Sequence, residues 1–216
     1  MPETENKNNV EKRVLLADDI ELRVSEGKNP KLSGYAARFN KDSVDLGGFT
    51  ERIAPGAFDD ALGKSDVRAL KNHDPNLVLG RTASKTLRLN ANTKGLKFEV
   101  DMPDTTTGKD TVEEIRRGDI TGCSFAFTVA DGGDDWLDRP DGGWLRTINK
   151  VNELFDVGPV TYPAYPDTSV AARSLDAVKK ENKQEPVEEN KVDTVRRQRD
   201  NERKYARQLC TIKEFK

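Results

Sequence analysis

The chain has 216 residues, enough for one domain of ordinary size with tails and too few for two full domains. Hydrophobic and charged residues each make up 34%, a balance so polar that part of the chain is expected to lie outside any packed core. The net charge of -2, from 36 Lys and Arg against 38 Asp and Glu, excludes a global electrostatic argument for binding nucleic acid or an anionic membrane.

Short strands separated by turn residues dominate the predicted elements. Residues 1–10 are polar and charged without periodicity and are expected to form a disordered lead-in. Most of the later runs alternate apolar with polar residues, the pattern of strands with one buried face. Strands are predicted at 13–16, 20–24, 32–39, 67–70, 86–89, 96–100, 124–129, 144–148 and 152–160.

Two helices are predicted to interrupt the strands. The first follows residue 56 and ends near Gly63. Its apolar face holds Ala57, Phe58, Ala61 and Leu62. The second runs from about residue 109 to Gly118, with Thr106 or Thr107 as N-cap, acidic residues early and arginines late. We therefore predict a mainly β fold with helices (β+α), in which a single antiparallel sheet curls into a barrel.

The composition changes sharply after Leu175, where Lys, Glu, Gln, Asn, Asp and Arg predominate. Residues 11–175 are therefore predicted to form one domain and residues 176–216 a charged tail. The last 23 residues hold eight Lys or Arg against three Asp or Glu, which favours docking on an acidic partner surface or on nucleic acid. A solvated extension without a partner is the alternative.

Several classes of protein are excluded by what the chain lacks. No apolar run approaches the roughly 20 residues that span a bilayer, and the start lacks a signal peptide's apolar stretch, so we expect a cytosolic protein without membrane contact. Cys123, Cys210 and the single histidine, His73, are too few for a disulfide framework or for a zinc site of thiolate and imidazole ligands. No metal or other cofactor is expected.

The lone histidine and one serine suggest nucleophilic chemistry. A serine hydroxyl is a poor nucleophile near neutral pH unless a base takes its proton, and imidazole suits that task. His73 follows a predicted strand, and Ser124 opens an apolar run. Phe125 and Phe127 are expected to face the core, which leaves Ser124 facing a cleft. A structural histidine on the surface is the alternative for His73.

A serine and histidine pair also needs a third group that holds the imidazole. Asp156 is the acid in the most apolar surroundings, and a carboxylate there is costly to bury unless it is paired. The structural alternative is an edge-strand aspartate in contact with water. Glu153 and Asp74 are the rival candidates for the third group.

Five blocks in chain order resemble the motifs of the tailed-phage prohead (capsid maturation) serine protease family. They fall within roughly residues 12–173, which is most of the predicted domain. The blocks are LSGYAARFN at 32–40, FTERIAPGAF at 49–58, NHD at 72–74 with LGRT at 79–82, GDITGCSFAF at 118–127, and LFDVGPVTYPAYP at 154–166. Five blocks in register are specific, whereas any one of them would be weak.

The resemblance implies a serine protease related in fold to the herpesvirus assembly protease (assemblin), a β-barrel surrounded by helices. By position, His73 is the base and Ser124 the nucleophile, and Asp156 orients the imidazole. The family usually carries Glu followed by Val-Ser where this chain has Asp156-Val157-Gly158. Because aspartate is one methylene shorter, this block is a departure from the family pattern.

The resemblance also implies a place of action and substrates. Such proteases are packaged inside the immature shell in the host cytoplasm, cleave the scaffold-like part of the capsid protein and often cut themselves. The expected partners are therefore the major capsid protein or its scaffolding segment and the chain itself, with a homo-oligomer left open. We expect the tail to direct the enzyme into the prohead and to be removed by self-cleavage.

Two other functions compete with proteolysis. A non-catalytic capsid scaffold or assembly chaperone would keep much of the sequence pattern without using the histidine and serine. An esterase with the same three residues is disfavoured because Ser124 lies outside a Gly-x-Ser-x-Gly elbow.

Overall fold

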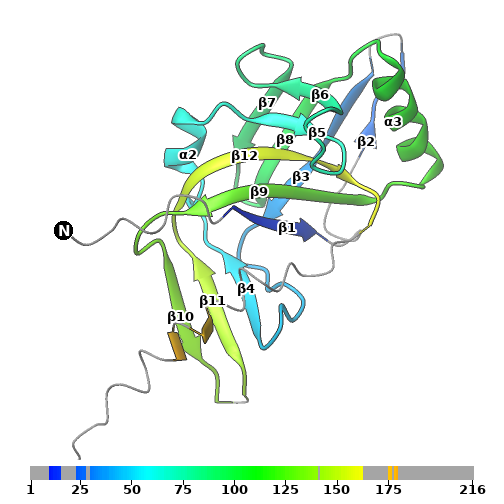
Figure 1. The fold of residues 1–216 in the computed structure, drawn as a ribbon. Helices are drawn as coiled ribbons and strands as arrows, with labels where there is room; N and C mark the ends of the chain where they lie inside the picture. The colour runs from blue at the N-terminus through cyan, green and yellow to red at the C-terminus, as the bar shows by residue number, and fades with distance from the viewer. Residues whose placement is uncertain are drawn as a thin grey trace, which may run out of the picture. The chain divides into compact units, whose positions relative to one another are not determined.

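The computed structural model describes residues 10–15, 23–27, 30–140, 142–162, 175–176 and 178–179, and Figure 1 shows the fold. The predicted lead-in, apart from Val10, and nearly all of the predicted tail lie outside these ranges. Among these residues the named helices are α2 (Asp59–Lys64) and α3 (Thr106–Arg117). The strands are β1 (Glu11–Leu15), β2 (Arg23–Val24), β3 (Lys31–Arg38), β4 (Phe49–Ile53), β5 (Arg68–Leu70), β6 (Val78–Arg81), β7 (Leu87–Ala91), β8 (Gly95–Asp101), β9 (Gly122–Val129), β10 (Asp134–Asp138), β11 (Trp144–Ile148) and β12 (Val151–Val160).

The described strands form three sheets. Their orders are β1-β9-β12-β5-β6, β2-β3-β8-β7 and β10-β11-β4. Figure 1 shows β9 and β12 side by side, with β1 along β9. The five-stranded sheet therefore brings together segments that lie far apart in the sequence, from the start of the chain to residue 160.

Most predicted strands are confirmed, while three short ones are found only in the structure. The alternating runs at 32–39, 96–100, 124–129 and 152–160 correspond to β3, β8, β9 and β12. The missed strands β4, β6 and β10 have at most five residues each, too few for a clear period. The beginning of the strand predicted at 20–24 lies outside the described residues.

The prediction of purely antiparallel pairing is wrong at two places. β12 pairs in parallel with β5, and β11 pairs in parallel with β4. The partners in each pair are separated by dozens of residues, so the connection is a long crossover rather than a hairpin. Among the described strands each sheet keeps two edges, and the single barrel stays a prediction.

Both predicted helices are present, with different starts. Residues 55–58 form turns before α2, but Ala57, Phe58 and Ala61 are buried as expected. For α3, Thr105 and not Thr106 or Thr107 is the N-cap, because its extended backbone lets the hydroxyl accept a hydrogen bond from Gly108 N. The first turn of α3 therefore holds no acid, although Gly118 ends the helix as predicted.

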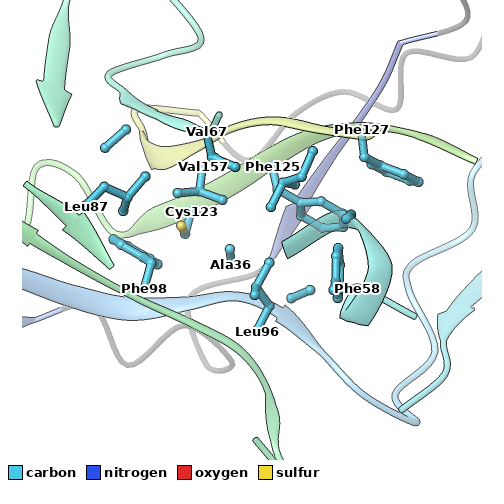
Figure 2. Packing of buried hydrophobic residues seen from close by; sticks show 14 of the residues in the cluster. Ala36, Phe58, Val67, Leu87, Leu96, Phe98, Cys123, Phe125, Phe127 and Val157 are labelled. Atoms are coloured by element: carbon cyan, nitrogen blue, oxygen red, sulfur yellow. The ribbon is translucent and has the colours of Figure 1, made fainter. Parts of the chain in front are cut away.

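The main core lies between the five-stranded and four-stranded sheets and α2. Figure 2 shows Phe125 and Phe127 of β9 packed near Phe58. The rings of Phe125 and Phe127 are stacked with centroids 4.9 Å apart, and Phe125 meets Phe58 edge to face at 5.7 Å. Packing of these rings in the core thus holds β9, the strand that carries Ser124, in place.

Among the described residues, the helices are all too short or too polar to span a membrane.

Replacing Phe125 with Ala is expected to lower the free energy of unfolding by about 3–5 kcal/mol, because a buried ring is lost and a cavity is left. Phe125 is 1% exposed. Urea unfolding followed by tryptophan fluorescence measures the change. The control is Leu137→Ala, since Leu137 is 60% exposed and its truncation is expected to stay within about 0.5 kcal/mol. An equal effect of both substitutions would contradict the described core.

Candidate active site

His73, Ser124 and Asp156 form one hydrogen-bonded chain that joins a turn after β5 to strands β9 and β12 of the five-stranded sheet. The distance between His73 Nε2 and Ser124 Oγ is 2.6 Å, and His73 Nδ1 lies 2.6 Å from Asp156 Oδ1. The side chains of His73 and Asp156 are 12% and 11% exposed. In the sequence, Ser124 lies 51 positions and Asp156 lies 83 positions from His73. The fold therefore brings the three residues together in a place that is largely shielded from water, where electrostatic interactions are strengthened.

Strands β9 and β12 position the serine and the aspartate. In their antiparallel pairing Ser124 lies opposite Gly158, and Asp156 lies opposite Ala126. Cys123, Phe125 and Phe127 belong to the core, so Ser124 points to the other face of β9, as predicted. The expectation that Ser124 opens on a cleft is wrong for this structure, because Ser124 is 0% exposed.

The histidine is carried by a tight turn after β5. Both Asn72 and His73 have positive φ angles, 55° and 57°, a conformation that asparagine tolerates better than most residues. The turn is fastened to the end of β12: Asn72 N donates to Pro159 O at 3.0 Å, and Thr161 N donates to Asn72 Oδ1 at 2.8 Å. Backbone strain at His73 is thus held by specific hydrogen bonds.

A second contact fastens the same turn to α3. Lys71 Nζ lies 2.6 and 2.8 Å from the two carboxylate oxygens of Glu114. Lys71 is mostly buried, whereas Glu114 is about one-third exposed. Because the lysine directly precedes Asn72, this ion pair also limits movement of the turn.

The rival acids make other contacts or face solvent. Asp74 Oδ1 accepts hydrogen bonds from the backbone and side-chain nitrogens of Asn76, at 2.8 and 3.0 Å. Glu153 is exposed on β12. The structure brings only Asp156, of the three candidate acids, to the imidazole of His73.

The thiol next to Ser124 is unsuited to nucleophilic attack. Burial raises the pKa of Cys123 to about 12, so the thiol is protonated at neutral pH. Its side chain faces the core and not His73.

Within the described ranges no group of three or more His, Cys, Asp and Glu side chains is arranged to hold a metal ion.

Sequence reasoning missed two residues that shape the site, Asn72 and Gly158. Asn72 was part of a motif, and its signal is that asparagine is favoured where φ is positive. Gly158 has a steric role: an added Cβ would lie 1.9 Å from the carbonyl oxygen of Leu70. The close approach of β12 to the end of β5 thus depends on the absence of a side chain at Gly158. This contact lies at Leu70, three residues before His73.

Replacing Gly158 with Ala is expected to reduce kcat/KM for peptide cleavage by about 100-fold, because the methyl group forces β5 away from β12 and moves His73 from Asp156. A small displacement suffices for such a loss. Since the chain has one histidine, the imidazole signals in an NMR spectrum are unambiguous, and the Nδ1 proton reports the hydrogen bond directly.

The matched control is Gly63→Ala in α2. An added Cβ at Gly63 has nothing within 4 Å, so activity and the imidazole spectrum are expected to stay as in the wild type. An active Gly158→Ala variant with an unchanged Nδ1 proton signal would show that β12 and β5 tolerate the methyl group.

The comparison with protein-family models agrees with the pattern of the sequence blocks. A family model described as Caudovirus prohead serine protease matches residues 18–181. No curated protein matches the chain. Among solved structures, the bacteriophage T4 capsid assembly protease gp21 is similar over 70% of this chain and 99% of its own, with 14% identity and a TM-score of 0.39.

Proposed function

Because the chain belongs to the Caudovirus prohead serine protease family, we propose that it is a serine endopeptidase with Ser124 as nucleophile, His73 as general base and Asp156 as the group that orients the imidazole. One observation carries the assignment of these roles. The hydrogen bonds run without a break from Asp156 through His73 to Ser124, with both distances at 2.6 Å.

The chemistry follows from this arrangement. His73 Nε2 takes the hydroxyl proton as Ser124 Oγ attacks the carbonyl carbon of a peptide bond. Asp156 accepts a hydrogen bond from Nδ1–H and stabilises the imidazolium that forms. His73 then gives the proton to the leaving amine, and a water molecule activated by the same imidazole hydrolyses the acyl-enzyme, which restores the serine.

The shorter acid in the third position is compatible with this role. Asp156 lacks one methylene relative to the usual glutamate, and Gly158 allows the backbone of β12 to lie close to Leu70 at the end of β5. This close approach supports a shorter bridge between β12 and the histidine turn. Asp156 is therefore proposed in place of Asp74 or Glu153.

The proposed substrates are the major capsid protein or its scaffolding segment, and the chain itself, inside the assembling prohead in the host cytoplasm. Membership of the family supports this proposal. We retain residues 11–175 as the protease domain, which is expected to form a barrel of the herpesvirus-protease type, and residues 176–216 as a targeting tail. Unchanged packaging after deletion of 176–216 would refute the targeting role.

Intact-mass analysis tests the protease directly. The wild type and Ser124→Ala are each produced alone and together with the major capsid protein that is the proposed substrate. Truncation of the capsid protein or of the tail only when Ser124 is present is the expected result. Identical masses with uncut but assembled capsid protein would instead favour the non-catalytic scaffold.

A further inference from the structure

The N-terminal strand covers the serine. β1 is the edge strand of the five-stranded sheet and pairs antiparallel with β9. Val14 lies opposite Ser124, and Arg13 lies opposite Phe125. An extended peptide commonly binds a protein in this way, by adding one strand to the edge of a sheet. β1 therefore occupies the edge of β9 beside Ser124, where an extended peptide would add as a strand.

The contact between β1 and the serine interferes with the proposed chemistry. Ser124 Oγ donates a hydrogen bond to the carbonyl oxygen of Arg13 at 2.8 Å and lies 2.6 Å from His73 Nε2. A hydroxyl has a single proton, so it cannot donate to both groups at once. While Arg13 O accepts that proton, His73 does not receive it, and Ser124 has no exposed surface.

Two charged side chains hold β1 in place. The carboxylate of Glu11 lies 2.7 and 2.9 Å from the guanidinium nitrogens of Arg146 on β11. The guanidinium of Arg13 makes two bonds of 2.7 Å to the carboxylate of Glu51 on β4 and lies over the ring of Phe127. Lys12 between them is exposed. Recognition of β1 thus uses an acid and, two residues later, a base.

Arg146 and Glu51, which bind the side chains of β1, also have ionic partners outside β1. Apart from its bonds to Glu11, Arg146 lies 2.6 Å from Asp134 and 3.1 Å from Glu51. Departure of β1 therefore leaves no lone buried charge, the condition that makes breaking a buried ion pair most costly. Burial alone raises the pKa of Glu11, but hydrogen bonds and charges from Arg146 and Arg13 lower it overall, so Glu11 is bound as an anion at neutral pH.

We propose that the edge of β9 is the binding groove for the substrate chain, that β1 is its intramolecular occupant, and that the groove selects an acidic residue two positions before a basic one. The inference rests on the proposed protease function. A substrate replaces β1 as an extended strand, with its acid on Arg146 and its base on Glu51. For cleavage, the carbonyl carbon of the basic residue must face Ser124 Oγ. In β1 it is the carbonyl oxygen of Arg13 that accepts the serine proton, so the enzyme is latent while β1 is bound.

The first experiment measures access to Ser124. In the full chain, Glu11→Gln with Arg13→Gln removes both charges while keeping polar side chains at both positions. We expect a fluorophosphonate probe to label Ser124 at least about tenfold faster in this variant than in the wild type, because loss of two buried ion pairs shifts β1 toward the open state. Lys12→Gln is the matched control, with the wild-type rate. Equal rates in all three proteins would overturn the proposal.

The second experiment measures the specificity of the groove. A fluorescein-labelled peptide with the sequence of residues 8–17, NNVEKRVLLA, is titrated into the double variant and followed by fluorescence polarisation. The control peptide NNVRKEVLLA has the same composition with the two charges exchanged. We expect the control to bind at least about tenfold more weakly. Equal binding of the two peptides would overturn the proposed acid and base selection.

A third measurement protects the test against a variant that fails to fold. In the wild type, excess unlabelled NNVEKRVLLA is expected to speed amide hydrogen exchange in residues 11–15 by displacing β1, while NNVRKEVLLA is not. Unchanged exchange with both peptides would overturn the proposal. If the peptide binds and displaces β1 but no fluorophosphonate labelling occurs, the protease function alone is refuted. If the capsid protein is cleaved but both peptides bind equally, only the proposed groove is refuted.

Discussion

Replacing Ser124 with Ala is expected to lower the rate of peptide-bond cleavage by about 10⁶-fold, since loss of the nucleophile in serine proteases removes most of the catalysis that the three residues supply together. The fold is expected to survive, because within the described part of the chain the hydroxyl bonds only to His73 and to the backbone of Arg13. The measurement is single-turnover cleavage of the capsid protein at matched protein concentrations.

The control for this substitution is its neighbour, Cys123→Ala. The thiol of Cys123 is buried on the core side of β9 and its pKa is raised to about 12, so cleavage is expected to continue in that variant after correction for any loss of stability. Cleavage that persisted in Ser124→Ala and disappeared in Cys123→Ala would reassign the nucleophile to the thiol.

Replacing Asp156 with Asn is expected to lower kcat by about 10⁴-fold, with little change in the geometry of the site. An amide nitrogen at this position would donate to His73 Nδ1, so the imidazole proton would lie on Nε2. A protonated Nε2 can no longer accept the proton of Ser124. The pH dependence of kcat together with the imidazole spectrum of the single histidine measures both the loss and the change of tautomer.

Glu153→Gln is the matched control on the same strand. Glu153 is exposed and lies opposite Thr128, away from the histidine, so the substitution is expected to leave kcat within twofold of the wild type by the usual size of surface effects. A large loss in Glu153→Gln combined with an active Asp156→Asn would transfer the third role to Glu153.

The candidate site was accessible from the sequence because its chemistry is rare in this chain. One histidine leaves one candidate imidazole, and an acid within an apolar strand requires a partner. Those two facts, with a serine at the head of an apolar run, pointed to His73, Ser124 and Asp156, with Glu153 and Asp74 as rival acids. The structure places Ser124 Oγ and Asp156 Oδ1 each 2.6 Å from a ring nitrogen of His73. Their roles in catalysis stay a proposal for the experiments above.

The strand pattern was predictable for a related reason. A strand with one buried face alternates apolar and polar residues, and this local property survives in any tertiary arrangement. β3, β8, β9 and β12 were found in this way. The short strand β4 was not, because its pairing with β11 is a relation between distant segments rather than a local pattern.

The chain by itself determined the type of most of its elements, the face of β9 that enters the core, and the small set of residues able to perform acid and base chemistry, since each depends on residue type and spacing alone. The tertiary structure decided what those residues contact. Long-range pairing put β1 over Ser124, the turn at Asn72 set the direction of His73, and the missing side chain of Gly158 let β12 approach β5. Such contacts join segments dozens of residues apart, and local pattern carries no information about which distant segments meet.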